Sequence, residues 1–133
     1  MNKETPLLHR IMLALTGVNT RTFRNQVGQG WYGKTRNIDR GVVVLENARP
    51  LKAGLCTGSS DLIGWHSVEI TPAMVGRRIA VFTAIEGKTG KTRTTDEQFN
   101  FLEAVRQAGG IALIVRDEDE IEDAVRSLNM WAG

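Results

Sequence analysis

Cysteine is almost absent from this sequence, because Cys56 is the only one among 133 residues. A single cysteine excludes an intrachain disulfide and a zinc site built from several thiolates. No apolar run reaches the roughly 18 residues that a membrane-spanning helix needs, and the N-terminal segment lacks the apolar core of a signal peptide. These absences predict a soluble protein that works in a reducing cytoplasm, with no membrane partner.

The composition fits one compact domain over residues 1–133, since 41% of the residues are hydrophobic and 24% are charged. The net charge of +2 permits nucleic-acid binding without requiring it. Charge is unevenly distributed, with basic residues before residue 41 (Arg21, Arg24, Lys34, Arg36 and Arg40) and acidic residues near the end (Asp117, Glu118, Asp119, Glu120, Glu122 and Asp123). The first half is therefore the expected phosphate-facing half.

Hydrophobic spacing predicts alternating helices and strands. We expect helices at about 4–16, 95–108 and 117–128, and strands at about 20–25, 42–45, 61–65, 78–88 and 111–115, with a glycine-broken segment at 28–33 and a loop at 54–61. For the short apolar run at 42–45 the alternative is a buried turn of helix. The runs at 78–88 and 111–115 are apolar enough to be buried on both faces. With the helix between them they predict a right-handed βαβ unit with parallel pairing.

The strand at 78–88 ends in an acid and a base that are separated by one residue. Glu86 and Lys88 would therefore point to the same face. The carboxylate would hold a divalent metal and the ammonium would lie beside a water or phosphate oxygen, which is an arrangement suited to phosphodiester cleavage. The alternative is a solvated strand end with an incidental ion pair, which contributes little.

Three further residues have both a structural and a chemical interpretation. Asp61 would share a metal with Glu86 if their strands were antiparallel neighbours, or it would simply cap a loop. Gln98 is either the capping-box partner of Thr95 or a group that positions the attacking water. Glu4 lies at the start of the first helix, where a negative charge complements the helix dipole.

Two glycine-rich stretches suggest contact with phosphates. Trp31 and Tyr32 lie beside Lys34 and Arg36, a mixture that suits either a groove that stacks on bases or a turn with a packed tryptophan. Residues 87–92 superficially match a nucleotide-binding P-loop. The first glycine of that motif and the helix that should follow at once are both missing, so no nucleotide cofactor is expected.

Taken in order, these motifs resemble a known family. The sequence has a first helix, then strands, Gly54-Leu55-x-x-Gly58-x-x-Asp61, Ile85-Glu86-x-Lys88, a helix bearing Gln98, Gly109-Gly110 and a buried strand. Over residues 4 to 125 this order resembles the VRR-NUC domain of the PD-(D/E)XK nuclease superfamily, in particular the small stand-alone members of phages and bacteria. The resemblance implies an α/β, restriction-endonuclease-like αβββαβ core, in which helices flank a mixed central sheet.

The resemblance also implies roles for individual residues. Asp61 and Glu86, with Glu4 and the backbone carbonyl of Gly87, would hold one or two Mg²⁺ or Mn²⁺ ions, while Lys88 would be the catalytic lysine and Gln98 the helix glutamine. The expected DNA contacts are Arg24, Asn25, Lys34, Arg36, Lys91 and Arg93.

The implied activity is that of a homodimeric endonuclease for branched DNA such as four-way junctions. Gly87 departs from the β-branched residue usual between the acid and the lysine, so the strand loses packing at this position. The alternatives are a DNA-binding module that keeps the fold without catalysis, and a protein-interaction domain that uses its acidic last helix.

Overall fold

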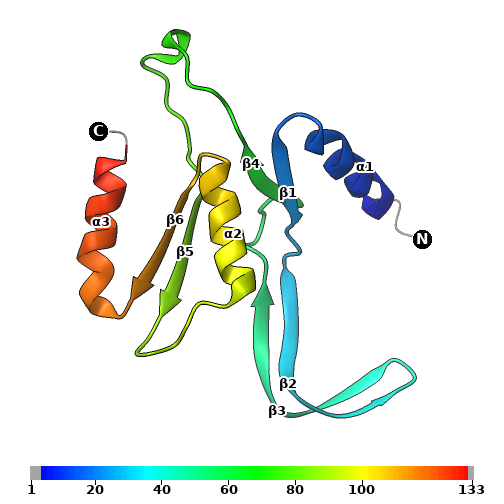
Figure 1. Cartoon of the computed structure of the whole chain (residues 1–133). Helices are drawn as coiled ribbons and strands as arrows, with labels where there is room; N and C mark the ends of the chain where they lie inside the picture. The colour runs from blue at the N-terminus through cyan, green and yellow to red at the C-terminus, as the bar shows by residue number, and fades with distance from the viewer. Residues whose placement is uncertain (1–3, 132–133) are drawn as a thin grey trace. The chain divides into compact units, whose positions relative to one another are not determined.

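The computed structural model describes residues 4–131, which form two compact units that meet in the sequence at Trp65 and His66 (Figure 1). These residues contain three α-helices, two short 3-10 helices and three two-stranded sheets. In chain order the elements are α1 (Glu4–Thr16), β1 (Thr20–Arg24), β2 (Gly28–Asp39), β3 (Val42–Ala53), β4 (Leu62–His66), η1 (Pro72–Met74), β5 (Thr83–Lys88), α2 (Asp96–Gln107), β6 (Ile111–Arg116), η2 (Glu118–Glu120) and α3 (Ile121–Met130).

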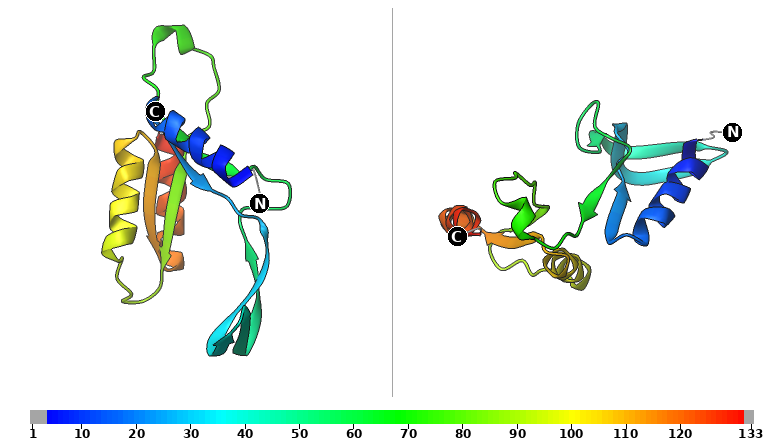
Figure 2. Two further views of the ribbon diagram at one scale, coloured as in Figure 1. Left: turned by 90° about the vertical axis from the view of Figure 1, so that its right-hand side faces the viewer. Right: turned by 90° about the horizontal axis from the view of Figure 1, so that it is seen from above.

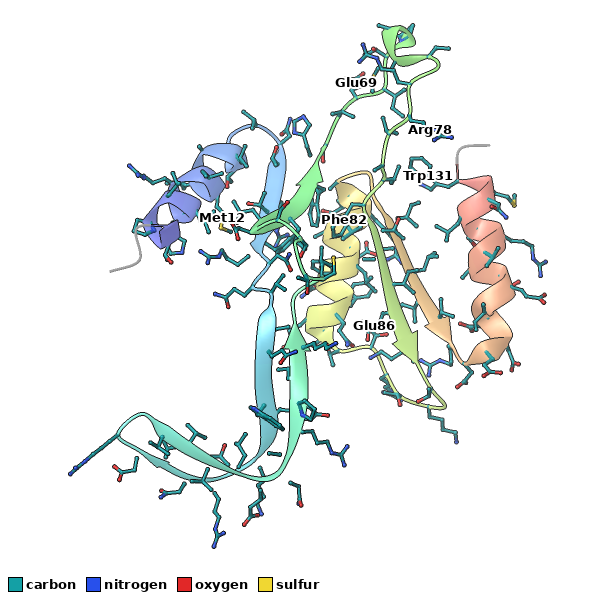
Figure 3. The ribbon with its side chains drawn as sticks, turned by 180° about the vertical axis from the view of Figure 1, so that it is seen from behind. Met12, Glu69, Arg78, Phe82, Glu86 and Trp131 are labelled. Atoms are coloured by element: carbon teal, nitrogen blue, oxygen red, sulfur yellow. The ribbon has the colours of Figure 1, made fainter. Side chains whose placement is uncertain are left out.

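Helix α1 has the bounds that its apolar spacing predicts. It packs against β1 and buries Leu8, while Met12, half-buried on the same helix, is labelled in Figure 3. Strand β1 pairs with β4, and this pairing sets the start of β4 immediately after Asp61. The predicted strands at 20–25 and 61–65 are thus confirmed to within a residue.

Close backbone approach fixes the contact between β1 and β4. A Cβ atom at Gly64 would lie 1.9 Å from the backbone oxygen of Arg21, so only glycine fits this position. The rings of Phe23 and Trp65 lie 5.5 Å apart, and the Arg21 guanidinium lies over both. These contacts tie the strand that follows Asp61 to the strand that precedes Asn25.

Strands β2 and β3 form a long antiparallel hairpin that extends from unit 1 (Figure 2). The expectation that glycines break regular structure at 28–33 is wrong, because β2 runs through them. Gly33 instead lies at a register shift, where a Cβ would be 2.6 Å from the Glu46 carbonyl oxygen. The turn falls at Arg40 and Gly41, whose φ angles are both positive, as in the tight turns that match strand twist.

Unit 2 is built on a strand, helix and strand in which β5 and β6 pair in parallel, as predicted. Helix α2 packs against both strands and α3 packs against β6, so the helices lie on either side of the strand pair (Figure 2). The predicted burial on both faces is wrong for the strand at 111–115, since Ile114 is 38% exposed. The strand predicted from residue 78 begins only at Thr83, and its predicted burial on both faces is wrong as well, since Ile85 is 55% exposed. The reason is that α2 covers one face of β5 only.

Both ends of α2 are fixed by its own sequence. Thr95 and Gln98 form the predicted capping box. At the other end Gly109 has φ +95°, and the Gly109 and Gly110 amides donate to the carbonyls of Arg106 and Val105 in a Schellman motif. The predicted stop at Gly109-Gly110 is confirmed. This precise start places Gln98 one turn into the helix.

The last predicted helix is divided into two parts. Asp117 has φ +55° and is not helical, and η2 precedes α3. Within residues 4–131 the architecture is a mixed α/β arrangement of small sheets and three helices. A single mixed central sheet stays a prediction, as does one domain over 1–133. None of the helices described is long and apolar enough to span a membrane.

Candidate active site

The β5 strand and helix α2 bring together three of the predicted residues. Side chains two residues apart on a strand point to the same face, so Glu86 and Lys88 both lie on the face of β5 that α2 covers. Lys88 Nζ lies 3.1 Å from Glu86 Oε1. The Lys88 side chain is 7% exposed and that of Glu86 is 27% exposed. This ion pair is largely shielded from water, unlike the solvated strand end that the sequence left as the alternative. Removing either partner would leave the other charge poorly hydrated.

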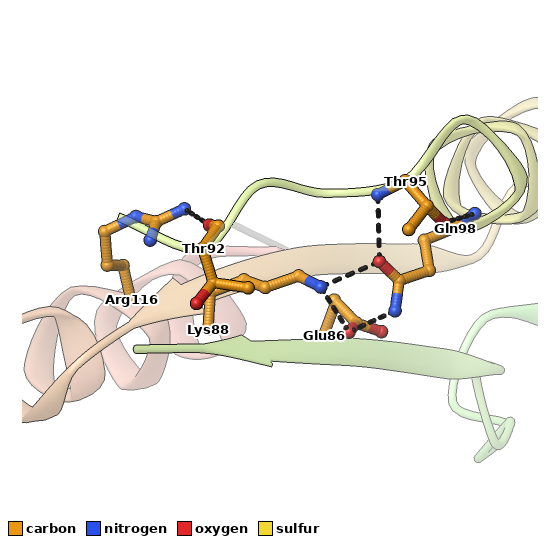
Figure 4. A network of polar contacts seen from close by, with 6 residues as sticks. All are labelled: Glu86, Lys88, Thr92, Thr95, Gln98 and Arg116. Atoms are coloured by element: carbon orange, nitrogen blue, oxygen red, sulfur yellow. Dashed lines mark hydrogen bonds and ion pairs between the residues drawn. The ribbon is translucent and has the colours of Figure 1, made fainter. Parts of the chain in front are cut away.

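Gln98 joins both members of this pair (Figure 4). Its Nε2 donates to Glu86 Oε1 over 2.7 Å, and its Oε1 accepts from Lys88 Nζ over 2.7 Å. The amide can take only this orientation, because a carboxylate only accepts hydrogen bonds and an ammonium only donates them. Gln98 is therefore both the capping partner of Thr95 and the residue that orients the acid and the base.

A pocket of about 280 Å³ lies beside this cluster in unit 2. Glu86 and Gln98 form part of its wall, and the remaining lining residues are Ala84, Ile85, Glu97, Phe101 and Leu102. The side chains of Ala84, Ile85, Phe101 and Leu102 thus give the pocket a largely apolar lining beside the Glu86 carboxylate.

The loop after Lys88 is held by two residues that the sequence did not single out as functional. The Arg116 guanidinium donates to the carbonyls of Gly90 and Thr92 over 2.5 and 2.8 Å. Asp117 accepts from the Gly90 amide over 3.0 Å, and its own amide donates to the Lys88 carbonyl over 2.9 Å. This clamp fixes residues 89–95, which connect Lys88 to the cap of α2. The available signal in the sequence was an arginine directly after the apolar run at 111–115.

The Gly87 carbonyl points away from β6. The carbonyls of Phe82 and Lys88 both accept from β6 or the residue after it, and a parallel ladder uses every second residue of a strand. Gly87 falls between the bonded positions, so its carbonyl is directed to the edge of β5 opposite β6. The Gly87 carbonyl is therefore not used by the β5–β6 ladder, and its role as a metal ligand stays a prediction.

Asp61 belongs to unit 1, where Asn25 holds the loop that leads to it. Asn25 is buried, and its Nδ2 donates to Ser59 Oγ and to the Ser60 carbonyl, both over 2.8 Å. Its Oδ1 accepts from the Leu55 amide, and its backbone amide donates to the Asp61 carbonyl. Asn25 thus fixes the backbone around Asp61, and its expected contact with DNA stays a prediction.

The other predicted residues are spread over both units. Lys34 and Arg36 are exposed on β2, while Lys91 and Arg93 are exposed on the loop at 89–95. Arg24 is half-buried, and its Nε is a buried atom without a hydrogen-bond partner among the described residues. The side chain of Glu4 lies outside what the structure describes.

The proposed metal ligands also fall in both units. Asp61 and Glu86 belong to strands or loops of different two-stranded sheets. Among the side chains that the structure describes, which do not include that of Glu4, no three from His, Cys, Asp or Glu gather closely enough to hold a metal ion. A shared metal site of Asp61 and Glu86 therefore stays a prediction.

A comparison with protein families gives one match, to the VRR-NUC domain over residues 45–117, which is more than half of the chain. The chain belongs to the VRR-NUC domain family. Among curated proteins and solved structures there is no match. As a VRR-NUC protein, a member of the PD-(D/E)XK superfamily, the chain has a nuclease-type, DNA-processing function, and its substrate is DNA.

The extent of the match separates the predicted site residues into two groups. The matched segment contains Asp61, Glu86, Gly87, Lys88, Lys91, Arg93 and Gln98. It begins after Glu4, Arg24, Asn25, Lys34 and Arg36, which therefore lie outside it. VRR-NUC nucleases typically use divalent metals. The segment that defines the family is thus the one that carries the acid, the lysine and the glutamine.

Proposed function

We propose that this VRR-NUC protein is a Mg²⁺- or Mn²⁺-dependent endonuclease that cuts branched DNA, such as four-way junctions, as a homodimer. The contact set of Glu86, Lys88 and Gln98 carries this proposal. A carboxylate, an ammonium and an amide converge within 3.1 Å of one another beside a pocket, in the segment that defines a nuclease family.

The chemistry of the candidate ligands fits a hard divalent cation. Glu86, Asp61, Glu4 and the Gly87 carbonyl offer only oxygen atoms, the ligands that Mg²⁺ and Mn²⁺ prefer. Glu86 Oε1 is occupied by Lys88 and Gln98, so Oε2 is the oxygen available for an ion. The family match runs across the junction of the two units, which supports one domain in which Asp61 and Glu86 act together.

A bound ion would polarise the scissile phosphate and lower the pKa of a water bound to it. The chain's own residues supply orientation and charge. Lys88 holds its ammonium at the end of β5, where it orients the attacking water or stabilises negative charge on the phosphate. Gln98 bonds both that ammonium and the Glu86 carboxylate and holds them in fixed positions, so that the cluster is organised before DNA binds.

The β2–β3 hairpin supports the proposed dimer and part of the DNA contact. Both of its strands are exposed along nearly their whole length, and a lone two-stranded ribbon is marginally stable in water. Its exposed apolar side chains include Trp31, Tyr32, Ile38, Val42, Val43 and Val44. A second copy would cover such a surface, while Lys34 and Arg36 would remain available for phosphates. Two active sites would then allow paired cuts.

The test is cleavage of labelled four-way junction, flap and linear duplex DNA with Mg²⁺ or Mn²⁺, with EDTA as the metal-free control. We expect metal-dependent cutting of the junction in preference to the linear duplex. Size-exclusion chromatography with light scattering should give twice the chain mass. Binding of all three substrates without any cutting would refute the nuclease proposal.

Gly87 favours one alternative, a DNA-binding module without catalysis, because glycine weakens a strand beside the acid. Glu86→Gln separates the two functions. In a nuclease it abolishes cutting and leaves the affinity for DNA nearly unchanged. In a binding module there is no cutting for it to abolish.

A further inference from the structure

Gln98 links the N-cap of α2 to the active site by hydrogen bonds. Thr95, the N-cap of α2, donates its backbone N–H to Gln98 Oε1 over 3.0 Å, and its Oγ1 accepts from the Gln98 backbone amide over 3.2 Å. The same Gln98 Oε1 accepts from Lys88 Nζ. One oxygen atom thus receives both a helix-capping bond and the bond from the buried lysine (Figure 4).

We propose that Thr95 is a positioning residue for the nuclease reaction, acting through Gln98 on Lys88 and Glu86. This inference rests on the proposed function. Without the Thr95 contact, the Gln98 side chain is held only by the two charged groups that it is meant to orient. The Gln98 side chain could then change rotamer and release Glu86 Oε1. Its Oε1 would have lost the bond from the Thr95 backbone N–H and would keep only the bond from Lys88 Nζ.

The backbone of Thr95 allows the contact to be removed cleanly. Its φ of −73° is compatible with proline, which has no N–H. Thr95→Pro therefore removes both the N–H donor and the hydroxyl, whereas Thr95→Val removes the hydroxyl alone. Thr95→Ser keeps both contacts and serves as the rescue variant.

Ser67 provides a matched control at the other end of the same helix. Its hydroxyl donates to the Ala108 carbonyl over 2.7 Å, and it has no contact with Gln98. Ser67→Ala therefore removes one hydrogen bond from an end of α2 and leaves the cluster of acid, base and amide intact. Any effect that comes only from a less stable helix will appear in this variant too.

The experiment measures kcat and KM for junction cleavage in Mg²⁺, together with the NMR signals of the Gln98 side-chain amide. We expect Thr95→Pro to lower kcat by about tenfold or more with little change in KM, because small displacements of catalytic groups are costly. The kcat of Thr95→Val should lie between those of Thr95→Pro and wild type. Thr95→Ser should have most of the wild-type kcat, and Ser67→Ala should have all of it. The Gln98 amide signals should shift in Thr95→Pro and stay in place in Ser67→Ala.

A folded Thr95→Pro variant with wild-type kcat and unshifted Gln98 signals would overturn the inference. If Thr95→Pro does not fold, as judged by circular dichroism, hydrogen exchange in the wild-type protein decides instead. A Thr95 N–H that exchanges as fast as an amide without a hydrogen bond would overturn the inference, because the bond to Gln98 Oε1 would be missing. If the wild-type protein cuts no DNA, the proposed function fails, and the Gln98 signals alone still decide whether Thr95 holds this side chain.

Discussion

Gln98 Nε2 lies 2.7 Å from Glu86 Oε1, so a helix residue fixes one oxygen of the carboxylate and leaves the other free. The two residues lie on different elements, α2 and β5, which pack against each other, and Leu102 of α2 and Ala84 of β5 both line the pocket. This relationship makes the helix glutamine part of the site's geometry.

Lys88→Met should abolish most of the cutting without weakening DNA binding. Methionine keeps the length of the side chain and removes the ammonium, so kcat should fall by about 10²- to 10³-fold, as when one stabilising donor is lost from an active site. The Lys88 ammonium would act on charge that develops in the transition state, and the residue is 8% exposed, so the dissociation constant for DNA should hardly change. Arg126→Met, which removes a positive charge from α3, is the control. A kcat equal to wild type would contradict the assigned role.

Asn25→Ala should destabilise unit 1 and reduce activity together. The substitution removes the side-chain bonds that hold Leu55, Ser59 and Ser60 in the loop before Asp61. Unsatisfied buried groups cost about 1–3 kcal/mol each, so the melting temperature should fall clearly. Mn²⁺ affinity should fall as well, because Asp61 is no longer held. Loss of DNA binding with unchanged stability would instead indicate a direct contact with DNA.

Gly87→Val should stabilise the protein. A Cβ at Gly87 meets no heavy atom within 4 Å, and valine favours a strand by up to about 1 kcal/mol over glycine. Cleavage should be retained, since only the backbone carbonyl of this residue is assigned a role. The control is Gly64→Ala, which places a Cβ 1.9 Å from the Arg21 oxygen and should lower the melting temperature. A more stable but inactive Gly87→Val protein would show that the reaction needs glycine here.

Arg116→Met should loosen the loop at 89–95. The guanidinium is the group that holds the carbonyls of Gly90 and Thr92. Trypsin should then cut after Lys91 and Arg93 faster than in wild type, because both are exposed on this loop. Arg126→Met again serves as the control and should leave the cutting rate at these two positions unchanged. Equal proteolysis in all three proteins would show that Arg116 does not restrain the loop.

Local patterns predicted much of the secondary structure. The apolar spacing of α1, the capping box of α2 and the glycine stop at Gly109-Gly110 all appear where expected, because each depends on neighbouring residues only. The shared face of Glu86 and Lys88 was also predictable, since alternation in a strand fixes it.

The features that the sequence did not predict depend on contacts beyond neighbouring residues. Gly33 was misread because close approach to β3, which is distant in sequence, requires glycine as much as a turn does. Burial of β5 was overestimated, since an apolar run does not reveal how many faces are covered. The anchoring role of Asn25 and the clamp of Arg116 depend on partners up to 35 residues away, and a single sequence does not reveal such pairings.

The proposed nuclease requires that Asp61 and Glu86 bind the same divalent ion, beside the ammonium of Lys88. Calorimetric titration of Mn²⁺ into wild type, Asp61→Asn and Glu86→Gln tests it most directly. We predict that wild type binds Mn²⁺ and that each variant loses at least about tenfold in affinity, or 1.4 kcal/mol, while remaining folded. Wild-type affinity in Asp61→Asn would contradict the shared site.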